Sequence, residues 1–414
     1  MADVCVIGLG YIGLPTALAF AESGKTVCGV DVSKAVCDTV NKGMVHIVEP
    51  GLEEFAKEVF ASGRFKASTS PVESKSFIIA VPSPITDEKK ADLSYVKSAA
   101  HSVADVLKPG DLVVLESTVP PRSTEEVLVP ELEKSGLKAK VDFLVAYCPE
   151  RVLPGEILNE IVNNNRIIGG IDERSAKAAC DLYSSFVKGD ILLTSATTAE
   201  ISKLMENTFR DVNIALANEL AKLCENYRVD AWEVIRLTNM HPRVDMLKPG
   251  PGVGGHCLAV DPWFIVEDQP ETARIIRLAR EINDSMPHYV ANLVDKNTED
   301  GGKVVLLGAA YKPDIDDMRE SPTLMIQDDL EGKGYEVSLV EPHVASYNKD
   351  IYEAATGCDT AVLCVNHTVF ANLDFQRLAA VMRGKVFVDT RNFFDKSCVV
   401  KAGFTYICLG NGLN

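Results

Sequence analysis

One cysteine stands in a glycine-rich turn, with a carboxylate four residues further on. The segment reads Gly250-Pro251-Gly252-Val253-Gly254-Gly255-His256-Cys257-Leu258-Ala259-Val260-Asp261. Glycines on the N-terminal flank of Cys257 leave the backbone open to close approach of a ligand. With a nicotinamide cofactor, a thiol presented in this way can capture an aldehyde and carry its oxidation on to the acid. The alternative is a buried structural cysteine, which is our interpretation of the other ten cysteines.

The N-terminus supplies the cofactor site that this chemistry requires. Gly8-Leu9-Gly10-Tyr11-Ile12-Gly13 follows a strand-like run, Val4 to Ile7, and opens a helix. Its first glycine permits a tight turn, its second lets the backbone approach a pyrophosphate, and its third allows helix and strand to pack. Asp31 ends the next predicted strand, where it can accept hydrogen bonds from the ribose hydroxyls and repel a 2'-phosphate. The pattern therefore predicts NAD as cofactor.

Two later turns follow predicted strands at the carboxyl edge of the same sheet, where ligands bind in such folds. They are Val81-Pro82-Ser83-Pro84 and Glu116-Ser117-Thr118-Val119-Pro120. We expect Pro82 to line the cofactor site and Thr118 to donate a hydrogen bond to cofactor or substrate. Taken alone, either turn could be an ordinary loop. Arg122, just beyond, must adopt an allowed turn conformation.

The elements that position these residues alternate between strand-like runs and helical patterns, which is typical of an α/β fold with parallel, doubly wound sheets. One helical pattern, Thr197 to Tyr227, is too long for a crossover inside a compact sheet and predicts a spine between domains. A strand and turn restart at Lys303. We predict two Rossmann-like domains, joined by the long helix and a central helical region. The predicted boundaries are 1–196, 197–299 and 300–414.

Composition excludes several classes of partner. The chain has 414 residues and a formal net charge of -17, which opposes binding to nucleic acid or to an anionic membrane. Eleven cysteines occur without a Cys-x-x-Cys pair, no signal peptide is evident, and no apolar run is long enough to span a membrane. We therefore expect a cytoplasmic protein with no nucleic-acid partner and no membrane partner.

The chain resembles the UDP-glucose/GDP-mannose dehydrogenase family nearly end to end. Three features carry this resemblance: the glycine pattern from Gly8 to Gly13 (the NAD fingerprint), the segment GVGGHC, and the helix ISKLMENTFRDVNIALANEL. The resemblance implies oxidation of a nucleotide-sugar C6 alcohol to the uronic acid with two NAD. It also implies an N-terminal NAD domain, a helical dimerisation region and a C-terminal nucleotide-sugar domain. CPERVLPGEILNEIVNNNRIIGG and HPRVDMLKPGPGVGGHCLAVDPWFIV are similar to the branch that oxidises UDP-N-acetyl-D-mannosamine. We expect a homodimer or a higher homo-oligomer.

The resemblance assigns roles to the catalytic candidates. Cys257 would attack the C6 aldehyde to give a thiohemiacetal, which a second NAD oxidises to a thioester. Lys203 and Asn207, four residues apart on one helical face, would stabilise the oxyanion. Asp261 would accept a proton through a water shared with Lys203. Without the resemblance, a helical lysine is usually a solvated charge and an aspartate before proline is usually a turn residue.

Glu150, in Cys148-Pro149-Glu150-Arg151, matches the family glutamate that positions or activates water for thioester hydrolysis. The alternative is a loop ion pair with Arg151. By the same resemblance Arg319 reaches the NAD phosphates, and Arg243 reaches a diphosphate across the dimer. The full set of predicted substrate contacts is Arg151, Val152, Lys203, Asn207, Arg210, His241, Arg243, Gly254 and Lys312.

Other functions remain open at this stage. The same fold could oxidise UDP-N-acetylglucosamine or UDP-glucose, because a few hydrogen bonds discriminate such sugars. A non-catalytic nucleotide-sugar scaffold would keep the fold without the chemistry. A zinc dehydrogenase using His241, His256 and Cys257 is disfavoured because the spacing matches no zinc site known to us. We therefore predict no metal site.

Overall fold

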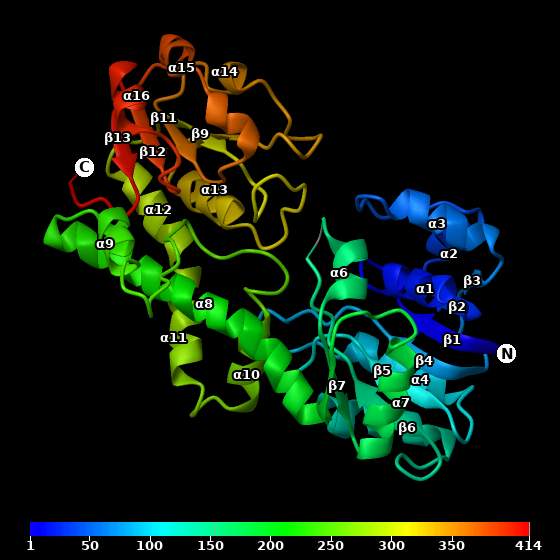
Figure 1. Ribbon diagram of the computed structural model, residues 1–414. Coiled ribbons are helices and arrows are strands. Elements are labelled where there is room, and N and C mark those ends of the chain that lie inside the picture. The colour runs from blue at the N-terminus through cyan, green and yellow to red at the C-terminus, as the bar shows by residue number, and fades with distance from the viewer. Residues whose placement is uncertain (154, 414) are drawn as a thin grey trace. The chain divides into compact units, whose positions relative to one another are not determined.

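The computed structural model describes residues 1–153 and 155–413 (Figure 1). They form two compact units, Met1–Glu206 and the chain from Asn207 onward. Each unit is built on a sheet whose strands are mostly parallel. Within the described residues, no helix is both long and apolar enough to cross a membrane.

The sheet of the first unit has the order β3-β2-β1-β4-β5-β6-β7-β8. Its strands are β1 (Ala2–Ile7), β2 (Val27–Val30), β3 (Phe65–Ser68), β4 (Ser74–Ile79), β5 (Leu112–Leu115), β6 (Leu144–Tyr147), β7 (Arg166–Gly170) and β8 (Ile191–Ser195). The first six strands have the dinucleotide-binding order, which reverses direction between β1 and β4 and creates a ligand-binding crevice there. The predicted parallel pattern has one exception, because β7 runs antiparallel to β6.

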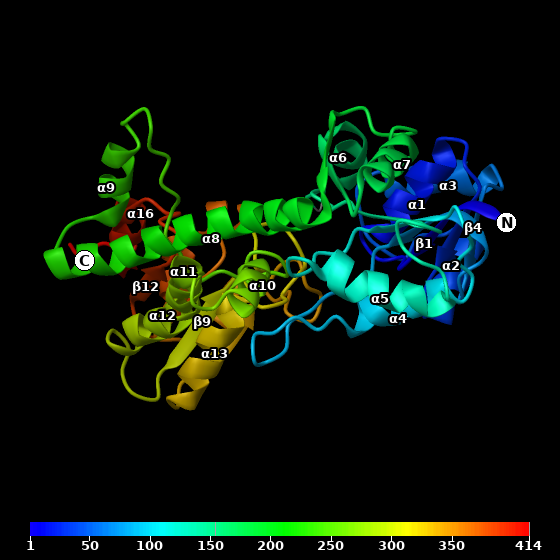
Figure 2. The same cartoon turned by 90° about the horizontal axis from the view of Figure 1, so that it is seen from below.

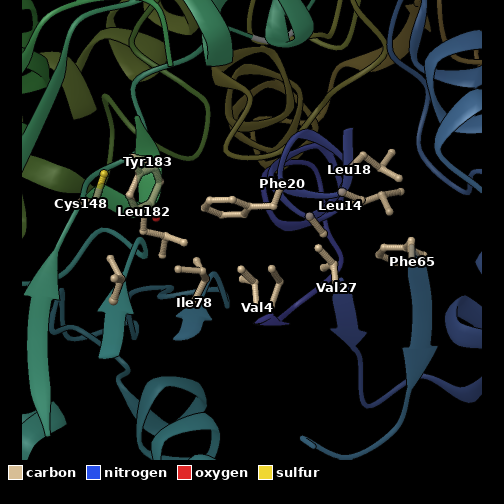
Figure 3. Close-up of a cluster of buried hydrophobic side chains, with 14 of the residues drawn as sticks. Val4, Leu14, Leu18, Phe20, Val27, Phe65, Ile78, Cys148, Leu182 and Tyr183 are labelled. Carbon is tan, nitrogen blue, oxygen red and sulfur yellow. The ribbon is translucent and has the colours of Figure 1, made fainter. Parts of the chain in front are cut away.

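Helices cover both faces of this sheet. They are α1 (Gly13–Glu22), α2 (Lys34–Asn41), α3 (Leu52–Ala61), α4 (Ser94–Ala104), η1 (Thr124–Leu128), α5 (Val129–Leu132), η2 (Glu133–Ser135), α6 (Ile157–Asn163) and α7 (Glu173–Tyr183). Successive residues of a strand point to opposite faces, so β1 sends Val4 into one core and Cys5 into the other. In the first core Leu14, Leu18 and Phe20 of α1 pack over the sheet (Figure 3). Strands buried on both faces explain the nearly continuous apolar runs in the sequence.

The second unit has a five-stranded parallel sheet of order β10-β9-β11-β12-β13. The strands are β9 (Lys303–Leu307), β10 (Glu336–Val340), β11 (Thr360–Leu363), β12 (Val386–Asp389) and β13 (Thr405–Cys408). The flanking helices are α13 (Pro322–Gly332), α14 (Ile351–Ala354), η3 (Thr368–Asn372), α15 (Phe375–Val381) and α16 (Lys396–Lys401). This is the other common doubly wound order, and its reversal point lies between β9 and β11.

The long predicted helix is confirmed as α8 (Ala196–Tyr227), which carries the boundary between the two units. In the second unit it is followed by α9 (Ala231–Thr238), α10 (Asp261–Asp268), α11 (Arg274–Asp284) and α12 (Met286–Asp295) (Figure 2). Buried polar contacts join α8 to α11: Arg280 pairs with Asp211 at 2.5 Å, and Asn218 donates to Asn283 at 2.9 Å. Because each of these side chains has a partner, they can be buried together, although Oδ2 of Asp211 and Nε of Arg280 have no hydrogen bond.

Candidate functional site

The glycine turn after β1 has the shape of a dinucleotide cradle. Gly8 has a φ of +94°, and a Cβ there would lie 2.3 Å from the carbonyl oxygen of Ala80. A Cβ on Gly13 would lie 1.8 Å from the carbonyl oxygen of Gly8, so only glycine fits at either position. Gly10 instead faces open space, because a Cβ there would have no heavy atom within 4 Å. That is the position where a pyrophosphate must approach the backbone. The residues present therefore fit NAD.

Asp31 holds this turn in place from the end of β2. Its carboxylate accepts the backbone N–H of Leu9 at 3.1 Å and that of Ser33 at 2.8 Å. The two neighbouring turns are tied together as well: Ser83 donates to the carbonyl oxygen of Thr118 at 2.5 Å. Pro82 is exposed and Thr118 is half-buried at this carboxyl edge. All the predicted cofactor residues of the first unit thus belong to loops at one edge of the sheet or, in the case of Gly13, to the first residue of α1.

Arg122 does adopt a strained turn, with a φ of +70°. Glu200, buried on α8, accepts the N–H of Arg122 at 2.6 Å and both the N–H and the hydroxyl of Thr124. Three hydrogen bonds to one carboxylate explain how a non-glycine residue keeps a left-handed conformation here. Glu200 was not singled out from the sequence, since a glutamate near the start of a long helix carries no distinctive signal.

Glu150 is the charge partner of Arg166, and the alternative pairing with Arg151 is wrong. Arg166 donates to Glu150 at 3.1 Å, and both side chains are buried. The other carboxylate oxygen of Glu150 accepts the N–H groups of Arg151 and Val152 at 2.6 and 3.0 Å. The Arg151 side chain pairs with Glu206 on α8 instead, at 2.7 Å. Glu150 is therefore held rigidly by two backbone N–H groups and by a cation from the antiparallel strand β7.

A second buried carboxyl group lies in the same network. Burial raises the pKa of Glu116 to about 7, against the opposing attraction of Arg166. Tyr183 donates its hydroxyl to Glu116 at 2.6 Å, and the Arg166 guanidinium lies over the Tyr183 ring, 5.2 Å from its centroid. Cys148 borders this group in the core, where burial raises the pKa of its thiol to about 12 (Figure 3). Cys148 is thus an inert, structural cysteine.

The thiol of Cys257 is presented by the turn that opens α10 in the second unit. The Cys257 side chain is exposed, and its carbonyl oxygen accepts the N–H of Asp261 at 2.8 Å. Asp261 is buried, and the side chain of Asn207 on α8 donates to its carboxylate at 2.6 Å. The structure therefore brings three of the five predicted catalytic residues together within one unit. Lys203, buried on α8, and Glu150 belong to the first unit.

The glycines before Cys257 make room for another part of the protein. A Cβ on Gly254 would lie 2.4 Å from the carbonyl oxygen of Glu320, and one on Gly255 would lie 2.9 Å from the Tyr311 ring. Gly255 also donates its N–H to the carbonyl oxygen of Arg319 at 3.2 Å. Close packing against the loop after β9 is thus the physical reason for these glycines. The sequence interpretation, close approach of a ligand, did not include this contact.

The same loop carries the two predicted cations of the second unit. Lys312 is exposed, and Arg319 forms a two-point pair with Asp317 in which the closest contact is 2.6 Å. Partial burial lowers the pKa of His256, and repulsion from Arg319 lowers it further. His256 is therefore neutral near pH 7. The remaining predicted contacts Arg210, His241 and Arg243 are exposed on α8 or in the loop after α9.

Arg391 is a candidate that the sequence interpretation missed. It follows β12, and its Nε donates to the carbonyl oxygen of Cys364 at 3.0 Å. A Cβ on Gly250 would lie 2.6 Å from the Arg391 guanidinium, so this cation lies against the start of the cysteine loop. Burial lowers its pKa to about 10. An arginine directly after a strand at the carboxyl edge of a doubly wound sheet was the available signal.

Sequence profiles of the UDP-glucose/GDP-mannose dehydrogenase family match three stretches that together cover most of the chain. The NAD binding domain matches residues 2–187, the central domain matches residues 197–285, and the UDP binding domain matches residues 305–396. The NAD fingerprint thus lies inside the family's NAD-binding domain, which confirms the predicted cofactor.

Individual proteins are similar over their whole length. The chain is 44% identical over 423 residues to a UDP-N-acetyl-D-mannosamine dehydrogenase from Methanococcus maripaludis, covering 99% of this chain and 97% of that protein. It is 45% identical over 409 residues to an NDP-N-acetyl-D-galactosaminuronic acid dehydrogenase from Ralstonia nicotianae, covering 94% and 96%. The solved structure of a UDP-D-ManNAc dehydrogenase from Pyrococcus horikoshii superposes with a TM-score of 0.94 at 42% identity, covering all of both chains.

Proposed function

This chain belongs to the UDP-glucose/GDP-mannose dehydrogenase family, and on that premise we propose that it oxidises UDP-N-acetyl-D-mannosamine at C6 to UDP-N-acetyl-D-mannosaminuronate. The reaction removes two hydrides from one carbon and adds one water, so that two NAD become two NADH. The observation that carries the proposal is the exposed Cys257 thiol, one helical turn before an Asp261 carboxylate that Asn207 holds at 2.6 Å. Simple alcohol oxidation would not require this thiol.

The cofactor is held by the turn from Gly8 to Gly13 and by Asp31, with Pro82, Thr118 and Arg319 as further proposed contacts. When bound, NAD accepts the hydride in each oxidation step. The family's NAD-binding domain covers all but one of these residues. Arg319 lies in the stretch that matches the UDP binding domain, so its role depends on the residue resemblance alone.

The chemical steps fall to a small set of side chains. Cys257 adds to the C6 aldehyde, forming a carbon–sulfur bond while the carbonyl oxygen takes up negative charge. Lys203 and Asn207 stabilise that oxyanion as a cation and an amide. Asp261 takes the released proton through an ordered water. Oxidation of the thiohemiacetal gives a thioester, and attack by water then breaks the carbon–sulfur bond and returns the Cys257 thiolate.

Glu150 acts in this last step by positioning the attacking water. Its two carboxylate oxygens already accept two backbone N–H groups and one guanidinium N–H. These contacts occupy lone pairs on both carboxylate oxygens and fix the orientation of the group. The geometry therefore supports orientation of water more than strong general-base catalysis. Arg151, Val152, Arg210, His241, Arg243, Gly254 and Lys312 remain the proposed substrate contacts.

A second candidate substrate differs only in the sugar. The Ralstonia nicotianae relative, whose name refers to an N-acetylgalactosamine derivative, is as similar in sequence as the mannosamine enzymes. The discriminating assay supplies purified protein and NAD with UDP-N-acetylmannosamine, UDP-N-acetylgalactosamine, UDP-N-acetylglucosamine and UDP-glucose in turn, and compares kcat/KM. The proposal expects the highest value for UDP-N-acetylmannosamine, with two NADH formed per sugar. A higher value for another sugar would overturn the substrate assignment.

The mechanism is tested with Cys257→Ala, matched by Cys398→Ala, which removes another exposed cysteine on α16. Cys257→Ala should lose formation of the acid and yield at most one NADH per sugar, whereas Cys398→Ala should keep both oxidations. Unchanged four-electron turnover by Cys257→Ala would exclude the thioester route. Binding of NAD and UDP-sugar without NADH formation by the wild type would instead indicate a non-catalytic scaffold.

We also infer that the protein works as a homodimer or higher homo-oligomer in the cytoplasm, divided functionally at 1–196, 197–299 and 300–414. Phe209, Leu216 and Leu223 recur every seven residues along α8 and are 67%, 54% and 42% exposed. Ile275 and Leu278 on α11 add exposed apolar area. An apolar stripe of this kind fits the same surface of a second copy, since a twofold dimer pairs identical patches.

A further inference from the structure

Three side chains with metal-binding atoms meet at the carboxyl edge of the second sheet. Asp314, His343 and His367 lie in the loops that follow β9, β10 and β11. Their donor atoms all lie within 4.8 Å of one another. The carboxylate of Asp314 is 3.5 Å from Nε2 of His343 and 3.8 Å from Nδ1 of His367. This is the reversal point of the sheet, where doubly wound folds bind their ligands.

The tautomer of His367 leaves a ring lone pair directed at this cluster. His367 is fully buried, and its Nε2 lies 2.9 Å from Glu341. The other Glu341 contacts are accepted backbone N–H groups, from Ala309 at 2.6 Å, Ala310 at 2.9 Å and His343 at 3.0 Å. Glu341 is therefore an acceptor, and Nε2 carries the proton. Nδ1 is then the bare nitrogen, in agreement with its acceptance of the Asp314 N–H at 2.9 Å.

This arrangement is the one that supports histidine ligands in metal sites. A ligating imidazole normally donates its second ring N–H to a carboxylate, which fixes the ring and increases the basicity of the ligating nitrogen. Glu341 provides that support to His367. Thr368 orients the Asp314 carboxylate in turn, through its N–H at 2.8 Å and its hydroxyl at 2.6 Å. Glu341 thus orients the imidazole and Thr368 orients the carboxylate, and an Asp314 oxygen lies 3.8 Å from Nδ1 of His367.

We propose that Asp314, His343 and His367 bind one divalent transition cation of the zinc class. Two imidazoles and one carboxylate suit zinc, cobalt or nickel, whereas magnesium and calcium prefer an all-oxygen set. Donors of a tetrahedral site lie about 3.3 Å apart, so the cluster contracts modestly around the ion. The ion takes over the His367 lone pair, and the Asp314 N–H turns away from it. The exposed ring of His343 completes the site from the solvent side.

The site is separate from the cysteine thiol but is connected to it through one loop. Asp314 lies two residues after Lys312, and Tyr311 of the same loop contacts Gly255 in the cysteine turn. Gly255 also donates to the carbonyl oxygen of Arg319 at the far end of that loop. A bound metal ion would therefore anchor the loop after β9, which carries Lys312 and Arg319. The proposal does not depend on which sugar is oxidised.

The test measures binding of Zn²⁺ and Co²⁺ to full-length protein that has been treated with chelator and dialysed. The parent protein carries Cys257→Ser, so that the thiol beside His256 cannot supply a competing site, and every other variant is made in this parent. His343→Ala removes an exposed ligand, and Asp314→Asn keeps the shape of a residue whose φ is +61°, which asparagine tolerates. His101→Ala, which removes an exposed histidine on α4, is the matched control. Isothermal titration gives stoichiometry and affinity, and the visible spectrum of Co²⁺ reports its coordination.

The parent protein and His101→Ala should each bind one equivalent with the same affinity. His343→Ala and Asp314→Asn should bind at least about tenfold more weakly, since even an outer-shell change typically costs 10- to 100-fold. Zn²⁺ should raise the thermal unfolding midpoint of the parent and not that of His343→Ala. Equal affinity in the parent and both ligand variants would overturn the proposal, as would the absence of saturable binding at tens of micromolar cation. The test measures metal binding and not oxidation activity. Its failure can therefore be distinguished from failure of the dehydrogenase assignment.

Discussion

The side-chain amide of Asn207 donates a 2.6 Å hydrogen bond to the carboxylate of Asp261, and both groups are buried. This bond ties α8 to the first turn of α10, whose N–H at Asp261 also binds the carbonyl oxygen of Cys257. The amide that we assign to the oxyanion and the acid that we assign to the proton are thus oriented by each other. A change in either should disturb the reaction more than the fold.

Asp261→Asn tests this relationship. The substitution keeps size and hydrogen bonding but removes the proton acceptor, so kcat should fall by about 10²- to 10⁴-fold, the usual contribution of general acid–base catalysis. KM for the UDP-sugar should change little. Steady-state NADH formation gives both constants, and thermal unfolding checks that the fold is intact. A kcat within a few-fold of the wild type would remove Asp261 from the mechanism.

Arg166→Met tests the buried ion pair in the first unit. Without Arg166, the Glu150 carboxylate is left buried with only two backbone N–H partners, and loss of one member of such a pair costs about 3 to 5 kcal/mol of unfolding free energy. Urea unfolding followed by circular dichroism measures the loss. In the double variant Arg166→Met with Glu150→Gln the loss should be smaller, because no unpaired charge remains. A double variant as unstable as the sum of both single variants would show that the two residues act independently.

Glu116 gives the first unit a pH dependence of definite sign. Its pKa in the folded protein is about 7, above the ordinary 4.5, because burial disfavours the carboxylate. The folded state binds this proton more tightly, so its stabilisation is present below about pH 4.5 and is lost as the pH rises through 7. Between pH 5 and pH 8 the wild type should lose about 2 to 3 kcal/mol more unfolding free energy than Glu116→Gln. Urea unfolding of both proteins at the two pH values measures the difference, and parallel losses would contradict the assignment.

Arg280→Met tests how the cysteine loop is anchored. Arg280 on α11 is buried, pairs with Asp211 on α8 and lies 3.4 Å from the carbonyl oxygen of Leu258, the residue after Cys257. Its removal should lower the unfolding free energy by about 3 to 5 kcal/mol, because the pair is buried. It should also lower kcat, because Arg280 contacts the loop that carries Cys257. Arg277→Met, on the exposed face of the same helix, should stay within about 0.5 kcal/mol of the wild type. Equal effects of the two variants would argue against a specific anchor.

The sequence predicted the elements that carry a strong local signal. The turn from Gly8 to Gly13, its strand and the long helix over α8 all follow from residue spacing and are confirmed. Strands β3 and β8 carry little local signal. β3 reads Phe-Lys-Ala-Ser, and β8 exposes Leu192 and Leu193, so neither shows the alternation or the buried run expected of a strand. Edge strands have fewer neighbours to impose a pattern.

Pairings across the fold carry no local signal at all. Glu150 pairs with Arg166 and not with the adjacent Arg151, because β7 returns antiparallel beside β6 and brings Arg166 against the loop. The glycines before Cys257 accommodate Tyr311, which is far away in the sequence. The cluster of Asp314, His343 and His367 likewise depends on three separate loops. Such contacts follow from strand order, which composition and spacing do not determine.

The exposed stripe on α8 leads to a prediction about assembly. Phe209 is the most exposed of the three apolar residues that recur at intervals of seven, and Ile275 on α11 is 71% exposed. Replacing such a side chain by a charged one should cost a monomer little stability, because the exposed side chain buries little apolar surface within the monomer. In a twofold interface the same charge would be buried twice, facing its own copy.

Phe209→Asp should therefore shift the protein from dimer or higher oligomer to monomer at micromolar concentration. Truncating a central aromatic anchor costs about 2 kcal/mol or more of association free energy, and two copies are lost per dimer. Sedimentation velocity or light scattering measures the mass. Val400→Asp, which charges an exposed apolar residue on α16, should leave the mass unchanged. A monomeric wild type would contradict the proposed assembly, and an unchanged mass in Phe209→Asp would show that the α8 stripe is not the contact.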